Sequence, residues 1–116
     1  MHEVALAEGI FRIVSEQVLK TRPGARVVSV VVTIGELSHA EPHALTTAFL
    51  VMIKNTPIDG ARLIIERTKA EAVCTECDAT FSPAELIFVC PHCGSPFTEV
   101  TAGQELLVSS IEIEVD

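Results

Sequence analysis

The sequence is poor in the residues that bind nucleic acid. It contains no tryptophan and no tyrosine, and its aromatic content of 4% consists of five phenylalanines, so platforms on which bases could stack are scarce. Lysine and arginine number 8 against 16 aspartates and glutamates, which leaves a net charge of −8. Phosphate backbones are bound by clustered positive charge. We therefore expect no nucleic-acid partner, and instead a protein partner that presents a basic patch.

The chain also lacks a long apolar run and an export signal. No apolar segment is long enough to cross a bilayer, so we expect no membrane partner. The start Met-His-Glu has neither a basic n-region nor an apolar h-region, which predicts a cytoplasmic protein. Four cysteines in such a protein indicate metal or redox chemistry rather than structural disulfides. The length of 116 residues suits one domain with a small appendage.

The hydrophobic pattern predicts two helices and three strands in the main body. Apolar residues at helical spacing predict a helix over residues 4–20, and a second helix begins at Pro42. Valine-rich and alternating segments predict strands over residues 26–34 and 61–70, and a third strand follows Gly103. The predicted fold class is α+β, with two helices packed on a three-stranded sheet.

The same patterns name the residues that should face the core. On the first helix these are Leu6, Ile10, Ile13, Val14 and Val18; on the second they are Leu45, Ala48, Phe49 and Met52. On the last strand they are Leu107, Ser109, Ile111, Ile113 and Val115, with Glu112, Glu114 and Asp116 on the opposite side.

All four cysteines fall in one segment of different composition. Between about Val73 and Phe97 the chain holds every cysteine, three of its six prolines and no helical periodicity. Because the last strand is expected to return to the main sheet, this segment is an insertion rather than a tail. We expect residues 1–70 plus 103–116 to form one domain, and residues 71–102 to form an inserted lobe that a bound metal ion stabilises.

The four cysteines form two C-x2-C pairs, Cys74 with Cys77 and Cys90 with Cys93. A short C-x2-C turn presents both sulfurs to one point, so two such turns can converge on one tetrahedral ion. Four thiolates favour Zn²⁺ in a closed, structural site, which predicts a zinc-ribbon-like lobe. Iron bound by the same four thiolates and two redox-active pairs remain open as alternatives. His92 is either a neighbour of this site or a substitute ligand.

The amino terminus offers a second set of metal ligands. The α-amine of Met1, the backbone nitrogen of His2 and its imidazole can form two fused chelate rings. Ni²⁺ and Cu²⁺ gain strongly from such planar nitrogen donors, and coordination removes protons from the amine and the amide. Glu3 can supply a fourth ligand through its backbone nitrogen or its carboxylate. A solvated histidine without a metal is the alternative.

Further candidate ligands stand in the loop before the second helix. His39 and Glu41 carry ligand atoms there. In the alternative interpretation the loop is solvated and Glu41 caps the helix. His43, on the first turn of that helix, is expected to be exposed.

Several of these motifs occur together in one known family. They are Met1-His2-Glu3 at the start, Ile34-Gly35-Glu36-Leu37-Ser38 after the valine-rich strand, Cys74-x2-Cys77, Cys90-Pro91-His92-Cys93-Gly94, and the strand from Glu105 to Ile113. In this order the sequence resembles the HypA/HybF family of hydrogenase maturation proteins. The resemblance covers essentially the whole chain.

The resemblance implies a nickel metallochaperone rather than an enzyme. Members of the family deliver Ni²⁺ to the precursor of a [NiFe]-hydrogenase together with the GTPase HypB, so HypB and the hydrogenase large subunit become the expected partners. The resemblance implies nickel in the region of His2 and Glu3 and zinc at the four cysteines. Glu41 is the nearest match to an acidic nickel ligand of some members.

A second hypothesis belongs to a different class. The same four cysteines would suit a zinc-ribbon adaptor that binds other proteins and delivers no nickel. Neither hypothesis requires catalysis, because no nucleophile–base pair or phosphate-binding loop can be argued from the sequence. The long edge strands leave an exchange of elements between two copies, and hence a homodimer, open.

Overall fold

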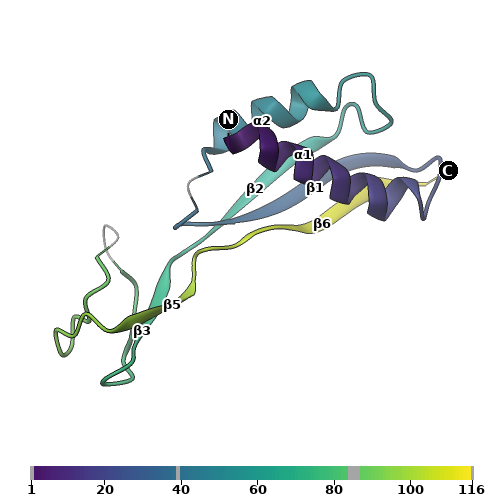
Figure 1. Ribbon diagram of the computed structural model, residues 1–116. Helices are drawn as coiled ribbons and strands as arrows, with labels where there is room; N and C mark the ends of the chain where they lie inside the picture. The colour runs from purple at the N-terminus through teal and green to yellow at the C-terminus, as the bar shows by residue number, and fades with distance from the viewer. Residues whose placement is uncertain (1, 39, 84–86, 116) are drawn as a thin grey trace. The chain divides into compact units, whose positions relative to one another are not determined.

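The computed structural model describes residues 2–38, 40–83 and 87–115. The fold is α+β, with two helices against a three-stranded sheet and an inserted zinc-ribbon-like lobe, which confirms the predicted fold class (Figure 1). Among the helices of these described residues, none is long and apolar enough to span a bilayer.

The chain divides into two compact units, each assembled from separate segments. The first unit contains the described residues within 1–33, 40–66 and 107–116. The second contains the described residues within 34–39 and 67–106. The first unit thus holds both helices, and the second holds all four cysteines.

The predicted first helix is present in two parts. α1 (His2–Val14) continues into a π-helical turn, η1 (Ser15–Leu19). Its buried stripe consists of Ala7, Ile10, Val14 and Val18. Ile13 was predicted to face the core but is 43% exposed. It lies at the edge of this stripe, because a periodicity of 3.6 residues rotates it away from the direction of Ala7 and Val14.

The second helix, α2 (Pro42–Met52), begins at the predicted proline. The Glu41 carboxylate caps it by accepting a hydrogen bond from the Ala44 N–H at 2.7 Å. Leu45 and Phe49 on this helix are fully buried, and α2 packs against α1. The cap is the alternative that the sequence leaves open for Glu41, and on the predicted core face Ala48 and Met52 are half-buried.

Both helices lie against one face of a sheet with strand order β2-β1-β6 (Figure 1). Its strands are β2 (Arg62–Thr68), β1 (Arg26–Gly35) and β6 (Leu106–Glu114). Hydrogen bonds from Ser29 Oγ to Glu112 Oε1 at 3.2 Å and from Arg26 to Glu114 at 2.5 Å link β1 to β6. Because the residue numbers rise on one strand and fall on the other, the two strands run antiparallel.

The outermost strand differs from the predicted alternation. Ile111 and Ile113 are half-buried, as expected, but Leu107 is 47% exposed and Val115 is 63% exposed. Ser109 accepts a hydrogen bond from the Thr33 hydroxyl on the exposed side of β1. The alternation therefore changes phase at Ser109–Ser110, which no period-2 pattern can anticipate.

The second unit contains a smaller antiparallel sheet with strand order β4-β3-β5. Its strands are β3 (Glu71–Cys74), β4 (Thr80–Phe81) and β5 (Thr98–Ala102). Ala72 pairs with Phe81 across β3 and β4, and Cys74 pairs with Thr98 across β3 and β5. This sheet places the first cysteine beside the segment that follows the last one.

Two glycines allow a close backbone approach where the lobe is inserted. Gly35 donates its N–H to the Glu105 carbonyl at 2.7 Å, and a Cβ at Gly35 would lie 2.1 Å from the Gly103 carbonyl carbon. Gly103 has a φ of +105°, and a Cβ there would lie 2.6 Å from the Ala70 Cα. Only glycine fits at these two positions without moving the backbone.

Replacement of glycine by alanine should change the stability of the protein in opposite directions at Gly35 and at Gly9. Gly35→Ala should destabilise the protein by about 1–3 kcal/mol, because the new methyl group clashes with backbone atoms. Gly9→Ala should stabilise it by about 0.5–1 kcal/mol, because Gly9 lies within α1 and a Cβ there meets nothing within 4 Å. Urea unfolding of the two variants measures both changes. A neutral Gly35→Ala would contradict the close approach.

Candidate metal centre

The two C-x2-C segments fold into turns of the same kind. The Cys74 N–H donates to the Ala79 carbonyl and the Cys90 N–H to the Ser95 carbonyl, both at 2.9 Å. The Cys74 carbonyl accepts from the Asp78 N–H, and the Cys90 carbonyl accepts from the Gly94 N–H, again at 2.9 Å.

Each turn closes on a left-handed residue. Asp78 has a φ of 62° and Gly94 a φ of 76°, a region that aspartate tolerates and glycine enters freely. Gly94 thus supplies the left-handed residue that closes the second turn. Backbone N–H groups in the turns also point at sulfur: Cys77 N–H donates to Cys74 Sγ at 3.5 Å, and His92 N–H donates to Cys90 Sγ at 3.4 Å.

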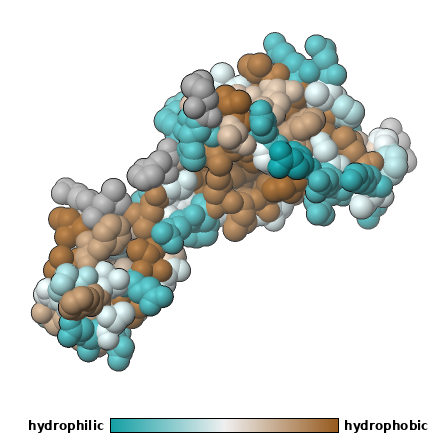
Figure 2. All heavy atoms as spheres, in the orientation of Figure 1, coloured by the Kyte–Doolittle hydropathy of each residue, from teal (hydrophilic) through white to brown (hydrophobic). Residues whose placement is uncertain are grey.

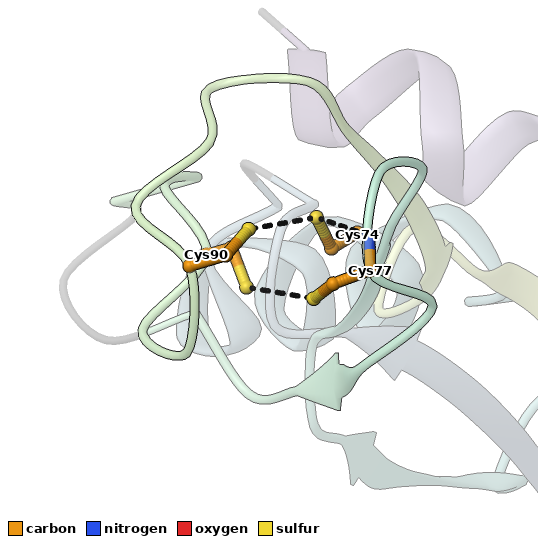
Figure 3. Close-up of side chains that lie close together, drawn as sticks. Cys74, Cys77 and Cys90 are labelled. Carbon is orange, nitrogen blue, oxygen red and sulfur yellow. Dashed lines mark hydrogen bonds between the residues drawn. The ribbon is translucent and has the colours of Figure 1, made fainter.

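The turns bring four sulfur atoms to one point. Cys74 Sγ lies 3.6 Å from Cys93 Sγ, and Cys77 Sγ lies 3.7 Å from Cys90 Sγ. All four sulfurs lie within 4.8 Å of one another. Figure 3 shows the side chains of Cys74, Cys77 and Cys90 directed toward one another. Zn–S bonds of about 2.3 Å place the sulfurs of a tetrahedron roughly 3.8 Å apart, so the cluster fits zinc.

The four thiols differ in exposure and in acidity. Cys74 and Cys90 are buried, whereas Cys77 and Cys93 are exposed. Burial raises the pKa of Cys90. Hydrogen bonds from the N–H groups of Cys93 and His92 and from the Cys77 thiol outweigh this effect and lower the pKa to about 6. The Ser95 N–H lowers the pKa of Cys93, yet Cys74 and burial raise it to about 12. A divalent ion that binds all four sulfurs must therefore displace a tightly held proton.

Two polar residues that the sequence analysis did not single out brace the turns. The Ser95 hydroxyl donates to Glu76 Oε1 at 2.8 Å and accepts from the Phe97 N–H at 3.0 Å. Glu76 lies inside the first cysteine pair, and Ser95 is buried just after the second. The contact joins the two turns, but neither residue type is specific enough to be predicted from sequence.

The predicted ligands near the amino terminus lie in the first unit. His2 begins α1 and is exposed. The Glu3 carboxylate accepts a hydrogen bond from the Glu41 N–H at 3.2 Å. This N–H and that of Glu3 itself lower the pKa of the Glu3 carboxyl. The structure thus brings Glu3 and Glu41 together, although they are 38 positions apart, and both carboxylates accept backbone hydrogen bonds.

Two other candidates cannot be placed in this way. Met1 and His39 lie outside the described residues. His43 is exposed, as predicted, and lines a shallow apolar hollow between α1 and α2 together with Glu3 and Val51. Within residues 2–38, 40–83 and 87–115, the four cysteines form the only group of three or more His, Cys, Asp or Glu side chains that could hold a metal.

The molecule combines an α+β body with an inserted lobe whose four cysteines can hold a metal ion. This combination indicates a small metal-binding protein. The family model described as "Hydrogenase/urease nickel incorporation, metallochaperone, hypA" matches residues 1–113. The chain belongs to this HypA family of hydrogenase maturation factors, which confirms the resemblance seen in the sequence.

Individual relatives agree in length and fold. The chain is 35% identical to hydrogenase maturation factor HypA of Geotalea uraniireducens over 98% of this chain and 100% of that protein. It is also 35% identical to HypA of Aquifex aeolicus over the full length of both. The solution structure of the nickel metallochaperone HypA from Helicobacter pylori is similar, with a TM-score of 0.71, 27% identity and coverage of 98% of each chain.

Proposed function

We propose that this protein binds Ni²⁺ at its amino terminus and delivers it for [NiFe]-hydrogenase maturation. The observation that carries the proposal is the match of a nickel-incorporation family over residues 1–113, together with the Met-His-Glu start. The first unit would hold the nickel, and the second unit would hold a structural zinc ion. Because nickel is cargo, it must be bound reversibly, and an exposed helix terminus suits that requirement.

The proposed nickel ligands are the Met1 amine, the backbone nitrogen and imidazole of His2, and the backbone nitrogen of Glu3. The first N–H groups of an α-helix have no partner in the helical ladder, so the start of α1 can lose amide protons without breaking that ladder. The Glu3 carboxylate is engaged by the Glu41 N–H, which supports a backbone role for Glu3. The Glu41 carboxylate caps α2 through Oε2, which leaves its other oxygen as the atom that could coordinate nickel.

The proposed zinc ligands are Cys74, Cys77, Cys90 and Cys93. Their sulfur separations suit a tetrahedral ion, and the two buried sulfurs have backbone N–H donors. With four protein ligands the ion has no open position, so zinc would stabilise the second unit rather than react.

The proposed partners are the GTPase HypB and the large subunit of a hydrogenase. Both are what the resemblance to the HypA/HybF family implies, and the net charge of −8 supports a partner surface with basic groups. β2 and β6 are the edges of the larger sheet, the positions at which a second copy would pair in a homodimer.

A two-metal measurement tests the proposal. Protein that starts at Met1 with no added residue should bind one zinc and one nickel per chain. Dialysis against EDTA should remove the nickel while the zinc remains, because the nickel ligands are exposed and the zinc site is closed. Elemental analysis before and after dialysis reads both metals. One zinc with no nickel would favour the adaptor hypothesis, and nickel that resists EDTA would contradict reversible delivery.

A further inference from the structure

The inserted lobe carries charge of only one sign. Between residues 71 and 102 the sequence has five carboxylates and neither lysine nor arginine. A divalent ion on four thiolates would add further negative charge at the cysteine cluster. Anionic partners such as nucleic acids and acidic membranes would be repelled by this lobe, and a cationic protein segment would be attracted.

An apolar hollow opens on the surface of the same lobe. It is lined by Phe81, Ser82, Pro83, Ile87, Val89 and Pro91 and has a volume of about 190 Å³. Ile87 is 56% exposed and Val89 is 45% exposed, and Figure 2 shows hydrophobic residues at the surface of this unit. Because drug-sized ligands occupy about 300–1,000 Å³, this hollow suits a single inserted side chain.

A carboxylate stands beside this apolar hollow. Glu71, Thr80, Phe81 and Ser82 line a second hollow of about 260 Å³, which shares Phe81 and Ser82 with the first. Pairing of Ala72 with Phe81 fixes this arrangement, because it holds the start of β3 against β4. Glu71 is exposed, and its side chain has no hydrogen bond or ion pair within the part of the chain that the structure describes.

We propose that these two hollows form a docking surface for a segment of a partner protein. An aliphatic or aromatic side chain of that segment enters the apolar hollow, and a neighbouring lysine or arginine pairs with Glu71. The apolar contact supplies most of the affinity, and the charge contact selects the orientation. The docking surface depends on the proposed zinc site only in so far as zinc holds β3 and the second cysteine turn in place.

The test uses the zinc-loaded full chain and a synthetic peptide, GGKLKGG, in which one leucine stands between two lysines. Amide resonances of residues around both hollows should shift in a ¹H–¹⁵N NMR titration. A peptide with serine in place of leucine, and one with glutamates in place of the lysines, should each bind about tenfold more weakly or not at all.

Matched variants separate this surface from general attraction to an acidic lobe. Ile87→Ser and Glu71→Lys should each weaken peptide binding about tenfold. Phe97→Ser and Glu99→Lys are the controls, because Phe97 is 64% exposed and Glu99 is exposed on β5, and neither lines the hollows. Val89→Ser provides a second apolar test. The controls should bind the peptide as the parent protein does.

Two results would overturn the docking proposal. One is equal weakening by the controls and by the hollow variants, and the other is equal binding of the lysine and glutamate peptides. Zinc content is measured on every sample: full zinc occupancy with either of these results rejects the docking surface alone. Absence of zinc from the parent protein rejects the proposed zinc site, and shifts around the hollows would still support docking.

Discussion

Replacing Cys77 by alanine should remove zinc from the protein and unfold the inserted lobe of residues 71–102 within the second unit, while α1, α2 and the β2-β1-β6 sheet persist. The buried side chains of the described part of this unit are mostly small, as at Ala70, Ala72 and Ser95, so they bury little apolar surface. Zinc binding would then supply most of the folding free energy of the lobe. Loss of a direct ligand should weaken zinc binding by at least about 100-fold, more than a lost second-shell contact does.

Elemental analysis and amide NMR spectra measure the two halves of this expectation. Zinc content should fall from one per chain to near zero, and the resonances of β3 and β5 should collapse to unfolded positions. Glu99→Ala is the matched control on the same lobe and should keep both the zinc and the spectrum. A Cys77→Ala protein with full zinc and an intact lobe would refute the proposed role of the four cysteines.

Removing the His2 imidazole, or moving the α-amine by one residue, should each abolish specific nickel binding. His2→Ala opens a chelate ring, and one added residue before Met1 takes the amine out of its ring while every side chain remains. We expect each change to weaken nickel binding by about 100-fold or more, as befits direct ligands. Because coordination displaces protons from the amine and the amides, nickel binding should also weaken as the pH falls.

Calorimetry with Ni²⁺ on two further variants makes the result specific. His43→Ala is the matched control, since His43 is exposed on the first turn of α2. It should bind nickel like the parent. Glu3→Gln should change the affinity by less than about tenfold, because the carboxylate already accepts the Glu41 N–H. Equal affinity for proteins with the native and the extended start would exclude the amine and direct attention to His39 or Glu41.

Local chemistry made several features predictable from sequence. Pro42 and Glu41 mark the start of α2, because proline suits the first helical turn and a carboxylate can cap it. The C-x2-C spacing predicts the cysteine cluster, because two short turns that share one ion leave few arrangements open to four sulfurs.

Features that depend on contacts between residues distant in sequence could not be predicted from sequence patterns. The phase change at Ser109–Ser110 depends on how β6 pairs with β1. The contact of Glu3 with the Glu41 N–H depends on how α1 packs beside α2. The Glu76–Ser95 brace depends on the two cysteine turns facing each other. In each case the partner is distant in sequence, so periodicity carries no information about it.

The close approach of Ala70 and Gly103 also has a consequence for chain entropy. The lobe leaves the chain at Ala70 and returns at Gly103, two residues already held in contact. Because Ala70 and Gly103 are in contact, the roughly 32 residues between them form a closed loop that connects β2 to β6, whether or not these residues are folded. Holding the ends of such a loop together costs only about 3 kcal/mol beyond a constant. Because each doubling of the length of such a loop adds only about 0.6 kcal/mol to this cost, evolution could lengthen or shorten the insertion with little effect on the body that carries the helices.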